Sequence, residues 1–179
     1  MTTPSTPATG DLRFAGRAWK FGDNVPTDEI VPTRWVFSPM EEIRRHAMEN
    51  LKPEFAGAVA PGDIVIGGKH FGQSSGRAVA AKVLKASGVA CIVADGFART
   101  FLRNCFEIGL PIVECAGAGA FAADGDELAV DAVSGTVRNI TTGGELAGRP
   151  TDPFLLGMLR AGGLIPLVRR EGSRLGLDG

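Results

Sequence analysis

The alternation of apolar and polar positions divides the chain into segments of two kinds. Residues 12–22 (LRFAGRAWKFG) alternate like a half-exposed strand, whereas 62–68 (GDIVIGG) and 89–94 (VACIVA) are short apolar runs rich in β-branched side chains. Between those two runs, apolar residues in 76–88 recur at helical spacing, and the pattern ends at Gly88. Strand, helix and strand in this order predict a βαβ unit in a parallel sheet.

The same outline repeats further along the chain and then changes. Residues 96–109 show apolar positions at helical spacing, and 110–116 form a third apolar strand. Residues 124–148 are short alternating segments joined by Asp-Gly and Gly-Gly turns, which predict antiparallel strands. Residues 152–172 are expected to close the chain with a helix that ends at Gly162 and a final strand. The fold class is therefore α/β, with parallel and antiparallel strands in one chain.

Two segments near the N-terminus carry weaker patterns. Residues 23–35 contain Pro26 and Pro32, whose rings disfavour a helix, so we expect an extended loop there, after the strand at 12–22. Residues 38–51 open with Ser-Pro and place acidic residues before basic ones, an order that suits the helix dipole. We expect a short surface helix there, and we interpret His46 within it as a solvated residue without a role.

Composition narrows the domain organisation and the partners. A chain of 179 residues with 44% hydrophobic content suffices for one buried core, so we expect one domain over 11–179 and a flexible Thr/Pro/Ser-rich tail at 1–10. Lys and Arg number 19 against 20 Asp and Glu, and this balance argues against a nucleic-acid partner. No run approaches the ~18 apolar residues of a membrane span, and we see no signal peptide. We therefore expect a cytoplasmic protein with no membrane partner.

The cysteines argue against metal or disulfide chemistry within this chain. Cys91, Cys105 and Cys115 are odd in number and lack the close paired spacing of a zinc or iron–sulfur motif. We interpret them as small core residues and expect no metal ligands in the chain.

The break after residues 62–68 predicts a ligand site. Glycines in this turn let the backbone bend sharply and approach a ligand, and Ser74 and Ser75 are expected where the following helix begins. Free backbone amides and the helix dipole favour an anion there, and Arg77 could add a forked donor for a carboxylate. The alternative is a plain turn with capping serines worth about 1 kcal/mol. The Walker and GxGxxG phosphate-binding patterns are absent from this turn.

Four motifs together carry a family resemblance: FGDNVPTDEIVP, GGKHFGQSSGRA, GFARTFLRNCFEIGLPIVE and TTGGELAGRPTDPFLLGMLRAGGLIPLVRR. In order and spacing they resemble the small subunit of 3-isopropylmalate dehydratase, the swivelling domain of the aconitase superfamily. The resemblance covers about residues 12–170 and implies a β/β/α three-layer domain with a central parallel sheet and an additional antiparallel sheet.

The resemblance also implies an activity of the leucine-biosynthesis type. It implies a hydro-lyase that isomerises a malate-type 2-hydroxy acid by dehydration and rehydration. The family uses a 4Fe-4S cluster carried by a separate large subunit, so the expected partner is that subunit, in a heterodimer, and this chain alone is expected to be inactive.

Site residues follow from the resemblance by alignment without a gap on Gly72, Arg77 and Ala80. The alignment implies a catalytic base at Ser75 and a substrate-binding arginine at Arg77. The family resemblance also implies substrate-binding positions at Ser74 and Gly76 in this turn and at Asp28 and Arg34 in and after the first motif.

The chain departs from the family pattern at several of these positions. Relatives typically read GKNFGCGSSREHA where this chain reads GKHFGQSSGRAVA, so Gly76 replaces a serine that bonds substrate, and Ala78 and Val79 replace a Glu-His pair. His70, beside the turn, is a candidate for substrate contact or for a structural hydrogen bond.

The loop after the first motif departs as well. It reads TRWVFSP where relatives usually read ARYL, and in the family this loop helps choose the substrate's side group. Trp35 and Phe37 are therefore candidate selectivity residues, with buried packing as the competing role for each. Two alternatives stay open: a related homoaconitase, citraconate or alkylmalate isomerase subunit, and a non-catalytic binding module.

Overall fold

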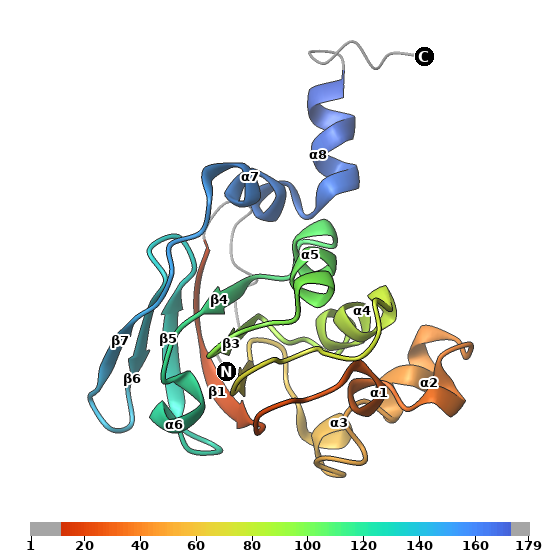
Figure 1. Cartoon of the computed structure of the whole chain (residues 1–179), viewed down its shortest axis with the longest axis horizontal. Helices are drawn as coiled ribbons and strands as arrows, with labels where there is room; N and C mark the ends of the chain where they lie inside the picture. Colours follow the sequence, from red (N-terminus) through yellow and green to blue (C-terminus); the bar gives the residue numbers. More distant parts are fainter. Residues whose placement is uncertain (1–11, 173–179) are drawn as a thin grey trace, which may run out of the picture.

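One sheet of seven strands runs through residues 12–172, the part of the chain that the computed structural model describes (Figure 1). Its strand order is β4-β3-β2-β1-β5-β6-β7, so β1 (Arg13–Lys20) lies at the centre. The strands on one side of β1 are parallel, β2 (Ile64–Gly67), β3 (Cys91–Ala94) and β4 (Ile112–Glu114). Those on the other side are antiparallel, β5 (Glu127–Asp131), β6 (Thr136–Asn139) and β7 (Glu145–Ala147).

The expected α/β fold is confirmed, and β1 joins its two halves. Every residue of β2 and β3 is buried, as a parallel sheet covered on both faces requires. Helices α4 (Ala78–Ala86) and α5 (Arg99–Glu107) pack against each other beside this parallel half. Helix α6 (Ala118–Phe121) contacts β2 and β3. In Figure 1 strands β5, β6 and β7 stand apart from α4 and α5. The flexible tail predicted at 1–10 lies outside the described residues.

The expected loop at residues 23–35 is wrong in part, because it contains two short helical turns. They are α1 (Thr27–Ile30) and the 3-10 helix η1 (Thr33–Trp35). Pro26 and Pro32 stand immediately before these turns, where the missing proline N–H costs nothing. The surface helix expected at 38–51 is present but shorter, as α2 (Met40–Arg45), and α3 (Phe55–Ala58) follows it.

The expected helix ending at Gly162 is confirmed. In α7 (Pro153–Ala161) the Asp152 side chain accepts a hydrogen bond from Phe154 N, and Gly162 ends the helix at φ 87°. The final strand is wrong, because Leu164–Glu171 forms helix α8. Pro166 lies in its first turn, where no intrahelical N–H bond is lost. Figure 1 shows α8 projecting beyond α7 and α5.

Candidate active site

The segments that follow β1 and β2 continue side by side beyond the ends of their strands. Asn24 N donates to Lys69 O at 2.7 Å, Gly72 N to Val25 O at 2.8 Å, and Thr27 N to Gln73 O at 2.8 Å. This backbone pairing carries the TDEI motif and the QSSGR turn to one place at the carboxyl ends of two parallel strands. Ligands of open α/β sheets commonly bind in such a position.

The turn itself has an unusual backbone. Gly72 has φ +80°, and a Cβ there would lie 2.1 Å from Cγ of the buried Phe101, so glycine is required for both conformation and space. Ser74 has φ +86°, a region that side-chain-bearing residues adopt at a cost. Its hydroxyl donates to Asp28 Oδ2 at 3.1 Å across 46 positions of sequence. Strain and a long-range bond therefore coincide at Ser74.

Ser75 faces a hydroxyl of α1. Its Oγ lies 3.0 Å from Oγ1 of Thr27, a side chain that is only 2% exposed, and its backbone N donates to the same Thr27 oxygen at 3.2 Å. Thr27 Oγ1 accepts that N–H, and its own proton has two acceptors within reach, Ser75 Oγ and, at 3.4 Å, Ser75 O. The partly buried Ser75 hydroxyl thus lies beside a polar partner rather than in hydrocarbon. Sequence reasoning missed Thr27, although it stands in the TDEI motif beside Asp28.

Arg77 and Asp28 form the charged part of the site. Arg77 Nη2 lies 3.1 Å from Asp28 Oδ1, with the side chains 33% and 41% exposed. That Oδ1 atom is buried and has no partner in hydrogen-bond geometry, so the contact is an ion pair and leaves a lone pair unused. Arg77 keeps further donors in its planar fork for a second anion.

The expectation that the two serines lie where the helix begins is wrong. Helix α4 starts at Ala78 with Arg77 in the capping position, because the preceding turn pairs with α1 in extended form. The helix dipole falls off within one turn, so its effect is strongest at Gly76 and Arg77 rather than at Ser75. Gly76 O accepts a hydrogen bond from Asn104 Nδ2 at 3.1 Å, and this nearly buried amide of α5 was not predicted to have a role.

His70 has a polar partner outside the serine turn. Its Nδ1 lies 3.2 Å from Asn24 Oδ1, both residues are exposed, and both have positive φ, +56° and +57°. Gln73 Nε2 donates to Asn24 O at 3.1 Å. These bonds hold together the two paired segments, which favours the structural interpretation of His70.

The residues predicted for the site in the loop after α1 have different surroundings. Arg34 forms an ion pair with Glu49, and the Trp35 ring stacks on His46 with centroids 3.8 Å apart at 9°. The Phe37 side chain is 98% exposed, so burial is wrong for Phe37 and packing is right for Trp35. His46, expected to be merely solvated, is a packing partner.

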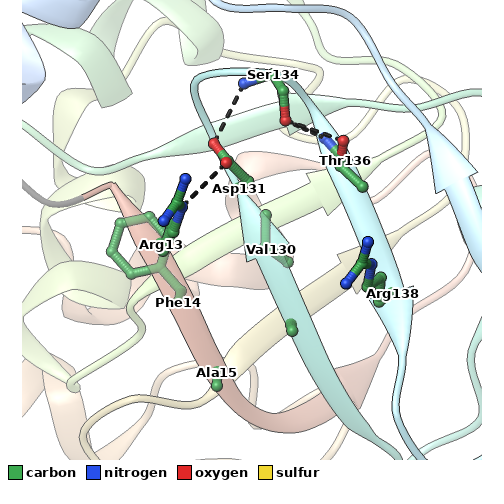
Figure 2. Close-up of a pocket in the computed structure, with 9 residues that line it drawn as sticks. Arg13, Phe14, Ala15, Val130, Asp131, Ser134, Thr136 and Arg138 are labelled. Carbon is green, nitrogen blue, oxygen red and sulfur yellow. Dashed lines mark hydrogen bonds and ion pairs between the residues drawn. The ribbon is translucent and has the colours of Figure 1, made fainter.

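A hollow lies elsewhere, on the antiparallel half. Figure 2 shows this cavity of about 500 Å³ over β1, β5 and β6. Its Arg13 pairs with Asp131 at 3.2 Å, its Arg138 pairs with Glu145, and Ser134 Oγ bonds Thr136 Oγ1 at 2.9 Å. None of the residues predicted for the site lies there.

Metal and membrane features can be stated for residues 12–172. Within them no group of three His, Cys, Asp or Glu side chains could hold a metal ion. The three cysteines are free and buried, and burial raises the pKa of each thiol. No helix in this part of the chain has the length and apolar character to cross a membrane.

Comparison with known proteins identifies the family of this chain. Residues 41–116 match the model of the aconitase C-terminal domain. The chain is 45% identical to the 3-isopropylmalate dehydratase small subunit 1 of Methanopyrus kandleri over 160 residues, which are 89% of this chain and 94% of that one. The chain belongs to the family of 3-isopropylmalate dehydratase small subunits.

Members of the dehydratase small-subunit family with other names are similarly close. The isopropylmalate/citramalate isomerase small subunit of Methanocaldococcus jannaschii is 43% identical, with 87% of this chain and 94% of that one covered. The methanogen homoaconitase small subunit of Methanothermobacter thermautotrophicus is 45% identical, with 84% and 87% covered. A crystal structure of 3-isopropylmalate dehydratase from Methanocaldococcus jannaschii has a TM-score of 0.86 at 27% identity and covers 94% of this chain and all of that one.

Proposed function

We propose that this chain is the small subunit of a hydro-lyase that isomerises a 2-hydroxy di- or tricarboxylic acid by dehydration and rehydration. The observation that carries the proposal is the meeting of Ser75 and Arg77 with Thr27 and Asp28 at the ends of β1 and β2. Relatives named as subunits of dehydratases, isomerases and homoaconitases support the reaction class.

In this proposal Arg77 binds a substrate carboxylate. Its guanidinium offers two parallel donors to a carboxylate, and Asp28 holds its side chain at the turn. Ser74, bonded to the other Asp28 oxygen, fixes that carboxylate in turn. Asp28 thus serves as a positioning group for Arg77, held on one oxygen by the Arg77 ion pair and on the other by Ser74.

Ser75 acts as the base, in its oxyanion form. Its Oγ takes the proton from the carbon next to the hydroxyl-bearing carbon, and the electron pair of that C–H bond forms the double bond as hydroxide leaves. Thr27 donates its hydroxyl to Ser75 Oγ and stabilises the oxyanion before this transfer. Ser75 then returns its proton to one carbon of the double bond while hydroxide adds to the other, at exchanged positions, which restores the Ser75 oxyanion and completes the isomerisation.

The leaving hydroxyl needs an electrophile that residues 12–172 do not supply, since they hold no metal-binding group. A 4Fe-4S cluster on a large subunit would supply Lewis acidity toward that hydroxyl. We therefore propose a cluster-bearing large subunit as the partner, and a cytoplasmic location in keeping with free thiols.

The test uses this chain co-produced with a cluster-bearing large subunit of the family. The complex is assayed for isomerisation of 3-isopropylmalate, citramalate and homocitrate. We expect Ser75→Ala to lower kcat by about 10²- to 10⁴-fold with assembly retained, the usual range for a general base. Ser134→Ala removes an exposed hydroxyl in the antiparallel half and is the matched control. An unchanged kcat of Ser75→Ala in an active complex would identify the chain as a non-catalytic module.

A related isomerase activity is the second candidate. Three relatives of nearly equal identity have names that specify different acids, so overall similarity does not choose the substrate. Phe37, fully exposed at the tip of the loop after α1, favours an acid with an apolar side group. The relative kcat/KM values of the three acids decide between these candidates.

A further inference from the structure

The loop of residues 33–38 has few backbone ties to the rest of the fold. Its backbone hydrogen bonds are local, such as Trp35 N to Pro32 O at 2.8 Å and Ser38 N to Trp35 O at 2.9 Å. Side chains make its long-range connections, and those of Arg34 and Trp35 lead to one residue, Glu49.

The Glu49 carboxylate accepts from three donors at once. Oε1 bonds Arg34 and, at 3.0 Å, Trp35 Nε1, while Oε2 lies 2.7 Å from His46 Nδ1. Partial burial raises the pKa of Glu49, but the hydrogen bonds from His46 and Trp35 and the Arg34 charge outweigh it, so the pKa is lowered overall. The charged form is thus the form that these donors stabilise.

His46 also holds the Trp35 indole in place, through ring stacking. Its ring stacks on Trp35 at 3.8 Å, and its Nε2 lies 3.3 Å from Glu42 Oε1. Carboxylates at both ring nitrogens fix the plane of the imidazole, and the imidazole fixes the plane of the indole. The contacts of Trp35 with His46 and Glu49 therefore anchor the loop.

The anchored loop is adjacent in sequence to part of the proposed site. It follows α1, which carries Thr27 and Asp28, and presents Phe37 with 98% of its side chain exposed. An exposed phenyl ring has apolar surface that a ligand's apolar group can cover. Glu49 ties down the loop segment next to Phe37, and the exposed Phe37 ring itself stays open to contact.

We propose that Glu49 is a positioning residue for substrate selection, which acts by clamping Arg34 and Trp35 so that the loop presents Phe37 to the substrate's side group. The proposal rests on the proposed function and deepens it. Glu49 touches no reacting atom. Its removal should change which acid is preferred, whereas removal of Ser75 should change turnover for every acid.

The first experiment follows Trp35 emission in this chain without a partner. The chain has two tryptophans, and Trp19 is only 1% exposed, so the difference between wild type and Trp35→Phe isolates the loop signal. We expect Glu49→Ala to shift this signal to longer wavelength and to increase its quenching by acrylamide. Glu41→Ala removes the same charge from the exposed Glu41–Arg44 pair and is the matched control. An unchanged Trp35 signal in Glu49→Ala would overturn the clamp.

The second experiment measures selection in the assembled complex. We expect Glu49→Ala to raise KM for 3-isopropylmalate and to lower its kcat/KM relative to citramalate by roughly tenfold, with kcat changed far less, since side-group contacts discriminate on this scale. Glu49→Gln keeps an acceptor for Trp35 but loses the charge, so it should fall between wild type and alanine. Cooperative thermal unfolding checks that both variants are folded.

The outcomes separate the two proposals. A shifted Trp35 signal with an unchanged preference among acids would overturn the selection role of Glu49. A wild-type complex inactive with every acid would overturn the proposed function, and the selection role with it, while the emission experiment still decides whether Glu49 clamps the loop. Loss of kcat with KM unchanged would assign Glu49 a role other than positioning.

Discussion

The two halves of the sheet present different surfaces to a ligand. The antiparallel half carries the hollow of Figure 2, where Arg13 pairs with Asp131 on neighbouring strands in regular register. The parallel half ends in loops, where Ser74 has a left-handed backbone and the buried Asp28 Oδ1 lacks a hydrogen bond. The hollow offers volume, and its charged side chains are paired. The loop site has a strained backbone and a carboxylate oxygen without a hydrogen bond.

The proposed site therefore lies where the backbone is strained and a polar atom is unsatisfied, and not at the hollow. Strained backbone and unsatisfied polar atoms persist only where the surrounding fold enforces them, and such places concentrate at functional sites. Exposed ion pairs within a ladder, such as Arg13–Asp131, contribute about 1 kcal/mol or less and need no ligand to explain them.

Breaking the backbone of the loop site should have the largest effect on stability. A Cβ at Gly72 would collide with the buried Phe101 ring, so we expect Gly72→Ala to lower the free energy of unfolding by about 3 kcal/mol, from overpacking plus left-handed strain. Gly143, between β6 and β7, has a similar φ of +82° but no atom within 4 Å of its Cβ position. Gly143→Ala should cost about 1 kcal/mol. Urea denaturation measures both, and equal losses would contradict the comparison.

Substituting one arginine in each half of the sheet should distinguish the loss of carboxylate binding from the loss of a surface charge. We expect Arg77→Ala to lower kcat/KM of the assembled enzyme by about 100-fold, because charge-assisted bonds to a carboxylate are lost. Arg138→Ala removes an equally charged side chain whose ion pair with Glu145 is exposed, and it should leave kcat/KM unchanged. Steady-state kinetics with the preferred acid is the measurement, and similar effects of both variants would show that Arg77 acts only through net charge.

Glycine at two serines should have effects of opposite sign. Ser74→Gly relieves the cost of φ +86° and loses one exposed hydrogen bond to Asp28, so we expect a net gain of about 0.5 kcal/mol. Ser134 lies outside the left-handed region, and Ser134→Gly should lose about 1 kcal/mol through backbone entropy. Thermal unfolding of both variants tests this, and destabilisation by Ser74→Gly would show that the Asp28 bond outweighs the strain.

Local pattern was enough to predict most of the sheet. The apolar runs at β2 and β3, the helical spacing of α4 and α5 and the Asp-Gly and Gly-Gly turns of β5–β7 all agree with the structure. Local pattern failed at α8, because Pro166 and the apolar residues Leu164, Ile165 and Val168 resemble a strand. In the structure that proline occupies a first turn, and the helix packs on α5 and α7.

The candidate site divides in the same way. Ser74, Ser75 and Arg77 were found from the glycine-rich break and the family motif, and Asp28 from the motif alone. Thr27 and Asn104 were missed, because their roles depend on contacts with the turn that are made by α1 and α5. The candidates Trp35 and Phe37 look alike in sequence, yet one packs on His46 and the other is exposed.

The sequence by itself determined the fold class, because periodicity and turn residues act over a few positions of chain. The resemblance of four motifs determined the family, and one of these motifs is the turn that carries Ser75 and Arg77. Only the tertiary structure decided which hydroxyl faces Ser75, which oxygen of Asp28 stays unsatisfied and which carboxylate anchors the loop. The contacts of Ser75 and Asp28 join segments that meet only after β1 and β2 pair, and the Glu49 contacts join the loop after α1 to the segment after α2. Their geometry is a property of the packed chain, and no local pattern encodes it.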